Sequence, residues 1–68
     1  MDINIRKAVL QNLNHATQDD VRSTIDDAIA RNEEVVLPGL GVLFEVLYKS
    51  ASVDEKQQMI DKLVTQLQ

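Results

Sequence analysis

The sequence holds few of the residue types that carry out covalent or metal chemistry. Its one histidine, His15, lies in the polar stretch Asn14-His15-Ala16, and the chain has no cysteine. A single imidazole does not make a zinc site, and without a thiol there is no disulfide and no cysteine–histidine pair. We therefore predict that His15 is a surface residue and that the chain has no catalytic residue, no metal site and no cofactor.

Four pairs of adjacent acidic residues are the remaining candidates for acid–base catalysis or metal binding. They are Asp19/Asp20, Asp26/Asp27, Glu33/Glu34 and Asp54/Glu55. Three of these pairs lie at expected helix starts or in turns, where solvated carboxylates are common, and the Asp26/Asp27 pair falls on the outer face of an expected helix. The sequence has no Asp-x-Asp-x-Asp-Gly loop for calcium. We therefore expect solvated acids and neither an enzyme nor a small-molecule substrate.

The most apolar stretch, residues 37–48, is the candidate for a core or interaction motif. It contains the only proline, both glycines and both aromatic residues of the chain. Gly39-Leu40-Gly41 resembles part of a phosphate-binding loop, but the third glycine and the following lysine are missing, so a tight turn with close packing is expected. Phe44 and Tyr48 are predicted core residues, with the alternative that they anchor a partner. The motif residues are Leu37, Pro38, Gly39, Leu40, Gly41, Phe44 and Tyr48.

The N-terminal third of the chain has the pattern of two amphipathic helices. Asp2 is the expected N-cap of a first helix that begins at Ile3, and this pattern fades near residues 12–15. Thr17 and Asp20 have the spacing of a capping box, with aspartate in place of glutamate. The apolar stripe of the second helix is formed by Val21, Ile25, Ala28 and Ile29.

The C-terminal third predicts one further helix. Ser52 and Glu55 have the spacing of a capping box, and the helix is expected to run from Val53 toward Leu67. Its apolar stripe is formed by Met59, Ile60, Leu63, Val64 and Leu67. Two ion pairs between residues four apart are also expected along the chain, Arg22 with Asp26 and Glu45 with Lys49.

The middle of the chain admits two structures. Val35-Val36-Leu37 is expected to be a short extended piece, because the residue before a proline avoids the α region, and Pro38 suits the first turn of a helix. Over residues 42–49 a helix gathers the apolar side chains on one broad face, whereas a strand alternates poorly. The predicted fold class is all-α, with the single domain 1–68 forming a compact bundle of four short helices around a buried central helix, Pro38–Tyr48. The alternative is an α+β fold with a histone-like β-hairpin at residues 35–47.

Charge and hydropathy limit the class of partner. The chain has seven basic and eleven acidic residues, a formal net charge of −4 and a pI of about 4.6. Non-specific nucleic-acid binding depends on neutralising phosphates, so nucleic acid is an unlikely partner. No segment approaches the about 20 apolar residues that cross a bilayer, and the first residues lack the apolar region of a secretory signal. We expect a reducing, aqueous compartment, no membrane, and either an unknown protein partner or a homodimer.

Two blocks of sequence resemble a known family. The first is Met-Asp-Ile-Asn-Ile-Arg-Lys-Ala-Val at the start of the chain, and the second is Leu-Pro-Gly-Leu-Gly-Val-Leu-Phe-Glu-Val-Leu at residues 37–47. They are similar to the minor small acid-soluble spore proteins of type I from spore-forming Bacilli. The resemblance implies synthesis in the forespore, residence in the spore core (the forespore cytoplasm) and a non-enzymatic structural or interaction role in sporulation, with no defined molecular activity. The DNA-coating α/β-type spore proteins differ, because their Glu-Phe/Ile-Ala-Ser-Glu cleavage site is absent here.

Acid solubility follows from the composition. In strong acid the eleven carboxylates are neutral, and the seven basic side chains, His15 and the amino terminus give a charge of roughly +9. A small chain without cysteine and with that much repulsion stays in solution even when it is unfolded.

A second likeness competes with the first. Residues 28–46 resemble the helix-to-hairpin segment of bacterial histone-like DNA-binding proteins, in which a glycine-containing turn joins two strands. Here Pro38 disturbs the first strand, and the basic arm that embraces DNA is missing. The alternative function is a nucleic-acid-binding module distantly related to those proteins.

Overall fold

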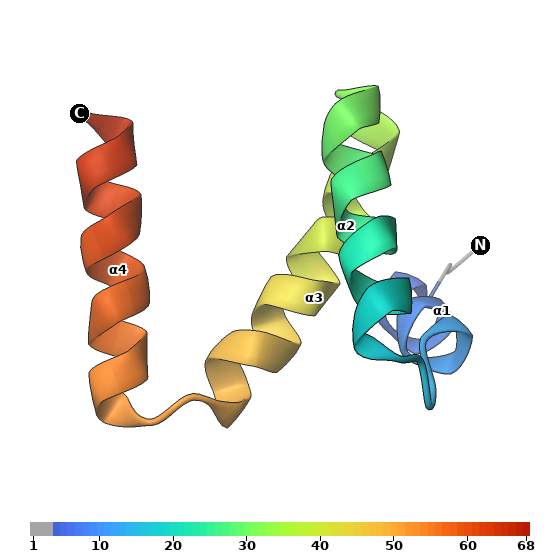
Figure 1. The fold of residues 1–68 in the computed structure, drawn as a ribbon, viewed down its shortest axis with the longest axis horizontal. Coiled ribbons are helices and arrows are strands. Elements are labelled where there is room, and N and C mark those ends of the chain that lie inside the picture. Colours follow the sequence, from blue (N-terminus) through green and yellow to red (C-terminus); the bar gives the residue numbers. More distant parts are fainter. Residues whose placement is uncertain (1–3) are drawn as a thin grey trace.

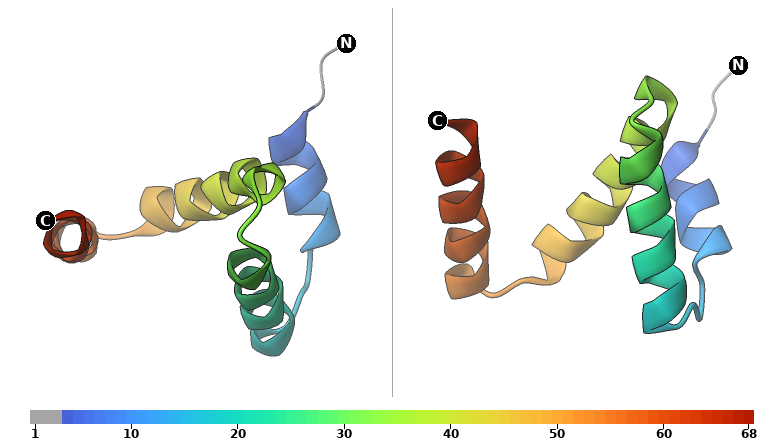
Figure 2. Two further views of the ribbon diagram at one scale, coloured as in Figure 1. Left: turned by 90° about the horizontal axis from the view of Figure 1, so that it is seen from above. Right: turned by 45° about the horizontal axis from the view of Figure 1, so that its top comes forward.

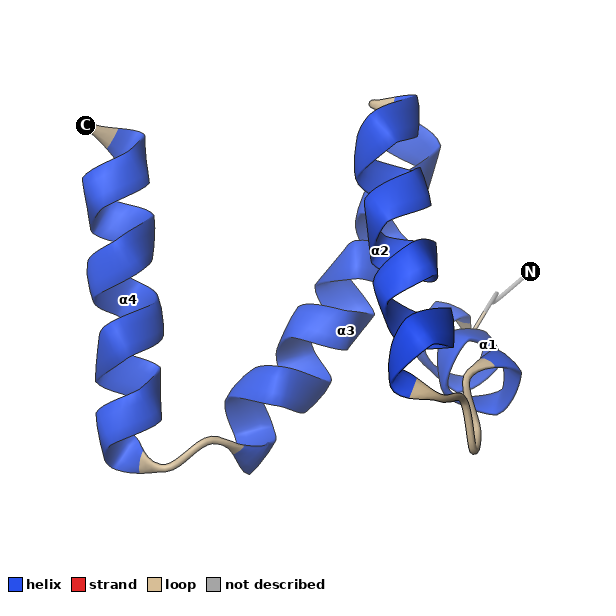
Figure 3. Cartoon of the chain, in the orientation of Figure 1, coloured by secondary structure: helices blue, strands red, loops and turns tan. Residues whose placement is uncertain are grey.

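The computed structural model describes residues 4–68, and within them the chain is all-α (Figure 1). The four helices are α1 (Ile5–Asn12), α2 (Gln18–Arg31), α3 (Leu37–Ser50) and α4 (Val53–Leu67), with a 3₁₀ turn, η1 (Glu34–Val36), between α2 and α3. The described residues contain no strand, and residues 37–47 are helical (Figure 3). The predicted all-α fold is confirmed, and the alternative hairpin at residues 35–47 is wrong.

Helix α1 begins one residue after a side-chain cap that differs from the expected one. The Asn4 side chain accepts a hydrogen bond from the backbone N–H of Lys7 at 2.9 Å, and the helix starts at Ile5. The expected cap Asp2 and the expected start Ile3 lie outside the described residues. After α1 the chain turns through His15, whose φ of 63° is left-handed. This turn leads the chain from α1 into α2.

Helix α2 begins with the predicted capping box. Asp20 N–H donates to Thr17 Oγ1 at 3.1 Å, and Thr17 N–H donates to Asp20 Oδ2 at 3.2 Å. The helix ends at Asn32, which is left-handed with a φ of 52°. The expected pairing of Arg22 is different, because its guanidinium lies 3.2 Å from Asp19 in the first turn and not on the C-terminal side at Asp26.

The connection into α3 is helical where an extended piece was expected. Residues 34–36 form η1, and Val36 N–H donates to Glu33 O at 3.2 Å. Extended backbone is confined to Glu33, while Leu37 before the proline has α-helical angles. Pro38 is then the second residue of α3, where its missing N–H has no intrahelical acceptor to lose. The predicted place of Pro38 in the first helical turn is confirmed.

The packing between helices is more open than a compact bundle with a buried centre. Helices α1 and α3 pack against each other, whereas α4 stands apart at the far end of α3 (Figures 1 and 2). Val42 of α3, 8% exposed, is the only buried apolar residue among those described. The radius of gyration is 13.3 Å, against about 11 Å for a compact chain of this length. The prediction that residues 38–48 are buried is therefore wrong for most of them, because the neighbouring helices cover only one side of α3.

Candidate interaction surface

One side of α3 forms a small core with the N-terminal helices. Val9 of α1 and Leu13, the C-cap of that helix, line a hollow together with Gly39, Leu40 and Leu43 of α3. A Cβ built on Gly39 would lie 3.9 Å from Val9 Cγ2, which is an ordinary contact distance. Close backbone approach therefore does not require the glycine at this position. The hollow is completed by Thr24 and Ala28 of α2 with Val35 and Val36.

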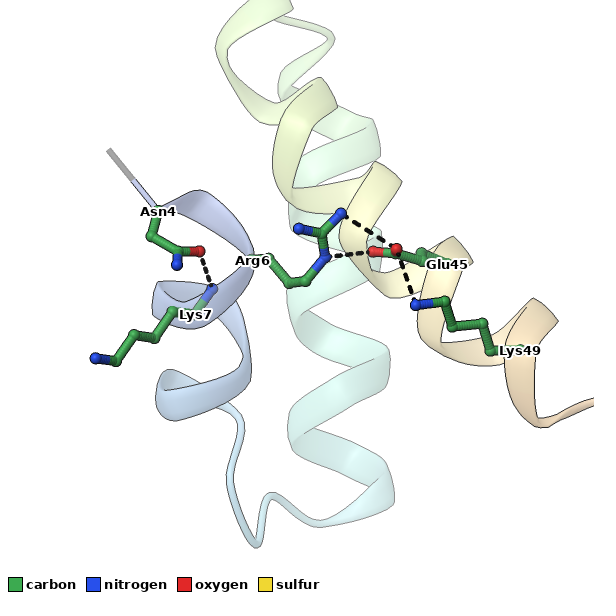
Figure 4. A network of polar contacts seen from close by, with 5 residues as sticks. All are labelled: Asn4, Arg6, Lys7, Glu45 and Lys49. Atoms are coloured by element: carbon green, nitrogen blue, oxygen red, sulfur yellow. Dashed lines mark hydrogen bonds and ion pairs between the residues drawn. The ribbon is translucent and has the colours of Figure 1, made fainter. Parts of the chain in front are cut away.

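A polar network at the edge of this core joins α1 to α3 (Figure 4). The Arg6 guanidinium donates two hydrogen bonds to the Glu45 carboxylate, Nε to Oε2 at 2.7 Å and Nη2 to Oε1 at 3.1 Å. The Lys49 ammonium lies 3.3 Å from Glu45 Oε1, as the spacing on the helix predicted. The hydrogen bond from Arg6, followed by that from Lys49, lowers the pKa of Glu45, and the same contact raises the pKa of Arg6. The paired form thus links α1 to α3 at neutral pH.

The Arg6–Glu45 contact had no signal in the sequence. The two residues are 39 positions apart, and either could have paired with a closer neighbour. Only the packing of α1 on α3 brings the two side chains together. The Glu45–Lys49 contact, in contrast, follows from one turn of helix.

The opposite side of α3 carries the aromatic pair. The rings of Phe44 and Tyr48 stack with centroids 5.7 Å apart, and Lys56 Nζ of α4 lies 5.1 Å from the Tyr48 centroid. Phe44 is 44% exposed and Leu47 is 54% exposed. The aromatic pair is therefore at the surface on the side of α3 that meets the start of α4.

The seven motif residues do not share one side of α3. Gly39 and Leu40 contribute to the hollow beside α1, whereas Phe44 and Tyr48 stack toward α4. Leu37 and Pro38 are exposed in the first turn of α3, and a Cβ built on Gly41 would meet nothing within 4 Å. The motif residues therefore lie on different sides of α3 and do not form one cluster.

Helix α4 begins with the predicted capping box. Glu55 N–H donates to Ser52 Oγ at 3.1 Å, and Ser52 N–H donates to Glu55 Oε1 at 2.7 Å. The backbone hydrogen bond from Ser52 is the main reason that the pKa of Glu55 is lowered. The predicted span from Val53 to Leu67 is confirmed. This helix is therefore defined by local signals.

The apolar stripe of α4 has little cover. Leu63 is 44% exposed and Leu67 is 81% exposed, and Ile60 and Val64 are also exposed. We call the exposed side of α3 and this stripe together the α3–α4 surface. It comprises Phe44, Leu47, Tyr48, Ile60, Leu63, Val64 and Leu67. Exposed apolar residues that share one side of a helix indicate an interaction site more often than scattered single residues do.

The candidates for acid–base and metal chemistry lie apart from this surface. His15 is exposed in the turn between α1 and α2, and Asp20 and Glu55 serve in the two capping boxes. Asp19 pairs with Arg22, and Glu33 lies 3.1 Å from the Arg31 guanidinium. Over residues 4–68 no group of three or more histidine, cysteine, aspartate or glutamate residues is placed to hold a metal ion. Over the same residues, no helix combines the length and apolar character that crossing a bilayer requires.

The fold and this surface define a small all-α protein with an open apolar face, and sequence comparison gives its family. The family model of small, acid-soluble spore protein I matches residues 3–67. The chain belongs to this family of sporulation proteins. Small, acid-soluble spore protein I from Bacillus cereus (strain AH187) is 52% identical over 63 residues, which cover 93% of this chain and 91% of the relative. The proteins of that name from Bacillus cereus (strain ZK / E33L) and Bacillus anthracis (strain A0248) show the same identity and coverage. No solved structure matches the chain.

Proposed function

We propose that this spore protein is a non-enzymatic component of the spore core that acts through protein–protein contact. The α3–α4 surface is the observation that carries the proposal. Exposed apolar side chains along one side of each of two helices are unfavourable in water, and a partner that covers them recovers the hydrophobic free energy. The family membership places the chain in sporulation.

The polar groups support a non-catalytic role. Each acidic side chain whose pKa is shifted has a structural partner, Arg6 and Lys49 for Glu45 and Ser52 for Glu55. His15 has no neighbouring nucleophile within the turn that holds it. None of these arrangements resembles a positioned acid–base pair beside a concave pocket.

The nucleic-acid alternative loses its structural basis. It depended on a histone-like hairpin at residues 35–47, and this segment is instead η1 and α3. The net charge of −4 also opposes association with phosphates. An electrophoretic shift of a duplex at low salt, lost steeply as salt is raised, would restore this alternative.

The location is tested with an antibody against the chain in sporulating cells. We expect immunogold label inside the forespore and then in the core of the mature spore, with none in growing cells. Equal label in growing cells and forespores would contradict the proposal.

The interaction is tested with the chain as bait in a forespore extract. We expect the wild-type chain to retain a defined protein and the Phe44→Ala variant to retain much less, because the exposed aromatic ring is lost from the surface. Ile29→Ala is the matched control, since Ile29 is exposed on α2 and lies outside the α3–α4 surface. Equal retention by the wild type and Phe44→Ala would exclude this surface as the contact.

A further inference from the structure

Helices α3 and α4 diverge from their short connection as the two arms of a V (Figure 1). We propose that two copies of this chain form a symmetric dimer in which α4 of each copy lies in the V of the other. The inference rests on the proposed role of the α3–α4 surface as an interaction surface, and it names a second copy of the chain as the partner.

The angle of the V is set by contacts at its closed end. Only Ala51 and Ser52 separate α3 from α4, and both have extended backbone angles. Ser52 is held by the capping box with Glu55, and the Lys56 ammonium lies over the Tyr48 ring. The capping box fixes how α4 begins, and the Lys56 contact joins its first turn to α3. Beyond this turn α4 stands apart from α3 and does not cover it (Figure 1).

The stripe of α4 faces into the V. Lys56 marks this side of the helix because it contacts Tyr48 of α3. Ile60, Leu63 and Leu67 follow Lys56 at spacings of four, seven and eleven residues, so they share its face. On α3, Phe44 is one turn before Tyr48 and stacks on it, so the other wall of the V is also apolar. Both helices therefore present apolar side chains that an amphipathic helix of a partner can cover.

The stripe has the heptad spacing of a helix-pairing seam. The residues Val53, Lys56, Ile60, Leu63 and Leu67 are separated alternately by three and four positions. Such a seam buries its side chains against the corresponding side chains of another helix. The acidic residues of α4 lie outside it, at Asp54, Glu55 and Asp61, so that two chains of net charge −4 can meet with these acids in water. Because no helix of the same chain covers this seam, its spacing indicates that a helix of a partner does.

The exposed area is large enough for a dimer interface. The chain exposes 5946 Å². A compact monomer of 7.7 kDa exposes about 4,300 Å², so the excess is about 1,600 Å². A stable interface of standard size buries about 800 Å² on each partner. The excess over the whole chain is therefore more than such an interface needs on each copy, and the uncovered sides of α3 and α4 contribute to it.

A second copy suits this surface because each chain carries both an uncovered side of α3 and an uncovered stripe on α4. With a two-fold axis the same residues serve on both sides, as in most homodimers. Two α3–α4 pairs then complete a four-helix arrangement, in which apolar faces meet in the centre. Gly41 agrees with this packing, because it lies one turn before the aromatic pair and has open space beside it that a helix of the partner can enter.

The test is sedimentation equilibrium of the full chain from about 5 to 500 μM, a range that spans the weak and moderate affinities of such interfaces. We expect a monomer–dimer equilibrium. Leu63→Asp places a charge in the seam and should weaken dimerisation about 100-fold, whereas Leu63→Ala should weaken it about 10-fold. Gln58→Asp adds the same charge on the opposite face of α4 and should change the dissociation constant by less than about threefold. The Val42 methyl signals in NMR spectra show whether each variant keeps its α1–α3 core.

The arrangement of the dimer is tested by isotope-filtered NMR on a mixture of labelled and unlabelled chains. We expect contacts between Leu63 of one copy and the Phe44 or Tyr48 ring of the other. A chain that stays monomeric throughout the concentration range would overturn the inference, as would a dimer that Leu63→Asp leaves intact.

These outcomes differ from a failure of the proposed function. A monomeric chain that still retains another spore protein through the α3–α4 surface refutes self-association and leaves the proposed function standing. A dimeric chain that is absent from the spore core refutes the proposed location and leaves the dimer standing.

Discussion

Helices α1 and α4 lie at opposite ends of the described chain and differ in how their apolar sides are covered. Helix α1 has eight residues and packs against α3, and its Val9 and its C-cap Leu13 line the hollow of the small core. Helix α4 has fifteen residues and a complete capping box, and its stripe is open. The shorter helix therefore depends on tertiary contacts, since an isolated helix of its length is not stable in water, whereas the longer one has the stronger local signals. Local signals define a helix without specifying what covers it.

The first prediction compares one valine from each region, and it has the largest expected effect. Val42→Ala should lower the free energy of unfolding by about 2 kcal/mol, because it removes methyl groups from the buried side of α3. Val53→Ala is the control, since Val53 is 82% exposed at the start of α4, and at a concentration where the chain is monomeric it should be nearly neutral. Urea denaturation followed by circular dichroism measures both. Equal losses would mean that α4 is as well packed as α3.

The second prediction concerns the two capping boxes. Ser52→Ala should cost about 1 kcal/mol of helix stability, because the backbone N–H of Glu55 loses its acceptor. Thr17→Ala should have a similar cost in α2. Amide hydrogen exchange separates the two cases, and the Ser52 variant should lose protection in α4 alone. Loss of protection in α1 in the Ser52→Ala variant would show that α4 stabilises the packing of α1 on α3.

The third prediction is a gain of stability at a helical glycine. Gly41→Ala should raise the stability of the monomer by about 0.5–1 kcal/mol, because alanine has the better helix propensity and the new methyl group meets nothing. The measurement is thermal unfolding at a concentration where the chain is monomeric. Gly39→Ala in the first turn, whose methyl group would meet Val9, is the comparison and should gain less. A loss of stability in Gly41→Ala would mean that this side of α3 is already covered within the monomer.

The fourth prediction has the smallest effect and concerns acid. The pKa of Glu45 is lowered in the folded chain, so its contribution to stability is fully present above the unfolded value of about 4.3 and is lost as pH falls through the folded value. We expect the α1–α3 contact to weaken below about pH 4.3, and we expect Glu45→Gln to remove that part of the pH dependence. Arg6 stays charged throughout. NMR titration of the Glu45 carboxyl and of α1 amides checks this, and an unchanged pH profile in Glu45→Gln would contradict it.

The capping boxes show how far local sequence could predict this chain. Thr17 with Asp20 and Ser52 with Glu55 form their predicted hydrogen bonds, because all the interacting groups lie within one turn of helix. The start of the first helix was harder to predict, since Asp2 and Asn4 are both residue types that cap helices well. The structure describes only Asn4. The prediction of extended backbone before Pro38 was wrong, because the 3₁₀ turn η1 overrides the weak preference of these residues for an extended conformation.

The sequence alone determined the all-α class, the extent of α4 and the helical, apolar character of α3, because these properties depend on spacing within one or a few helical turns. Tertiary structure decided the burial of Val42, the Arg6–Glu45 contact and the separation of α4 from the core. These features depend on the directions in which helices leave their connections. Such directions arise from contacts between residues far apart in the chain, and no local pattern of apolar residues encodes them.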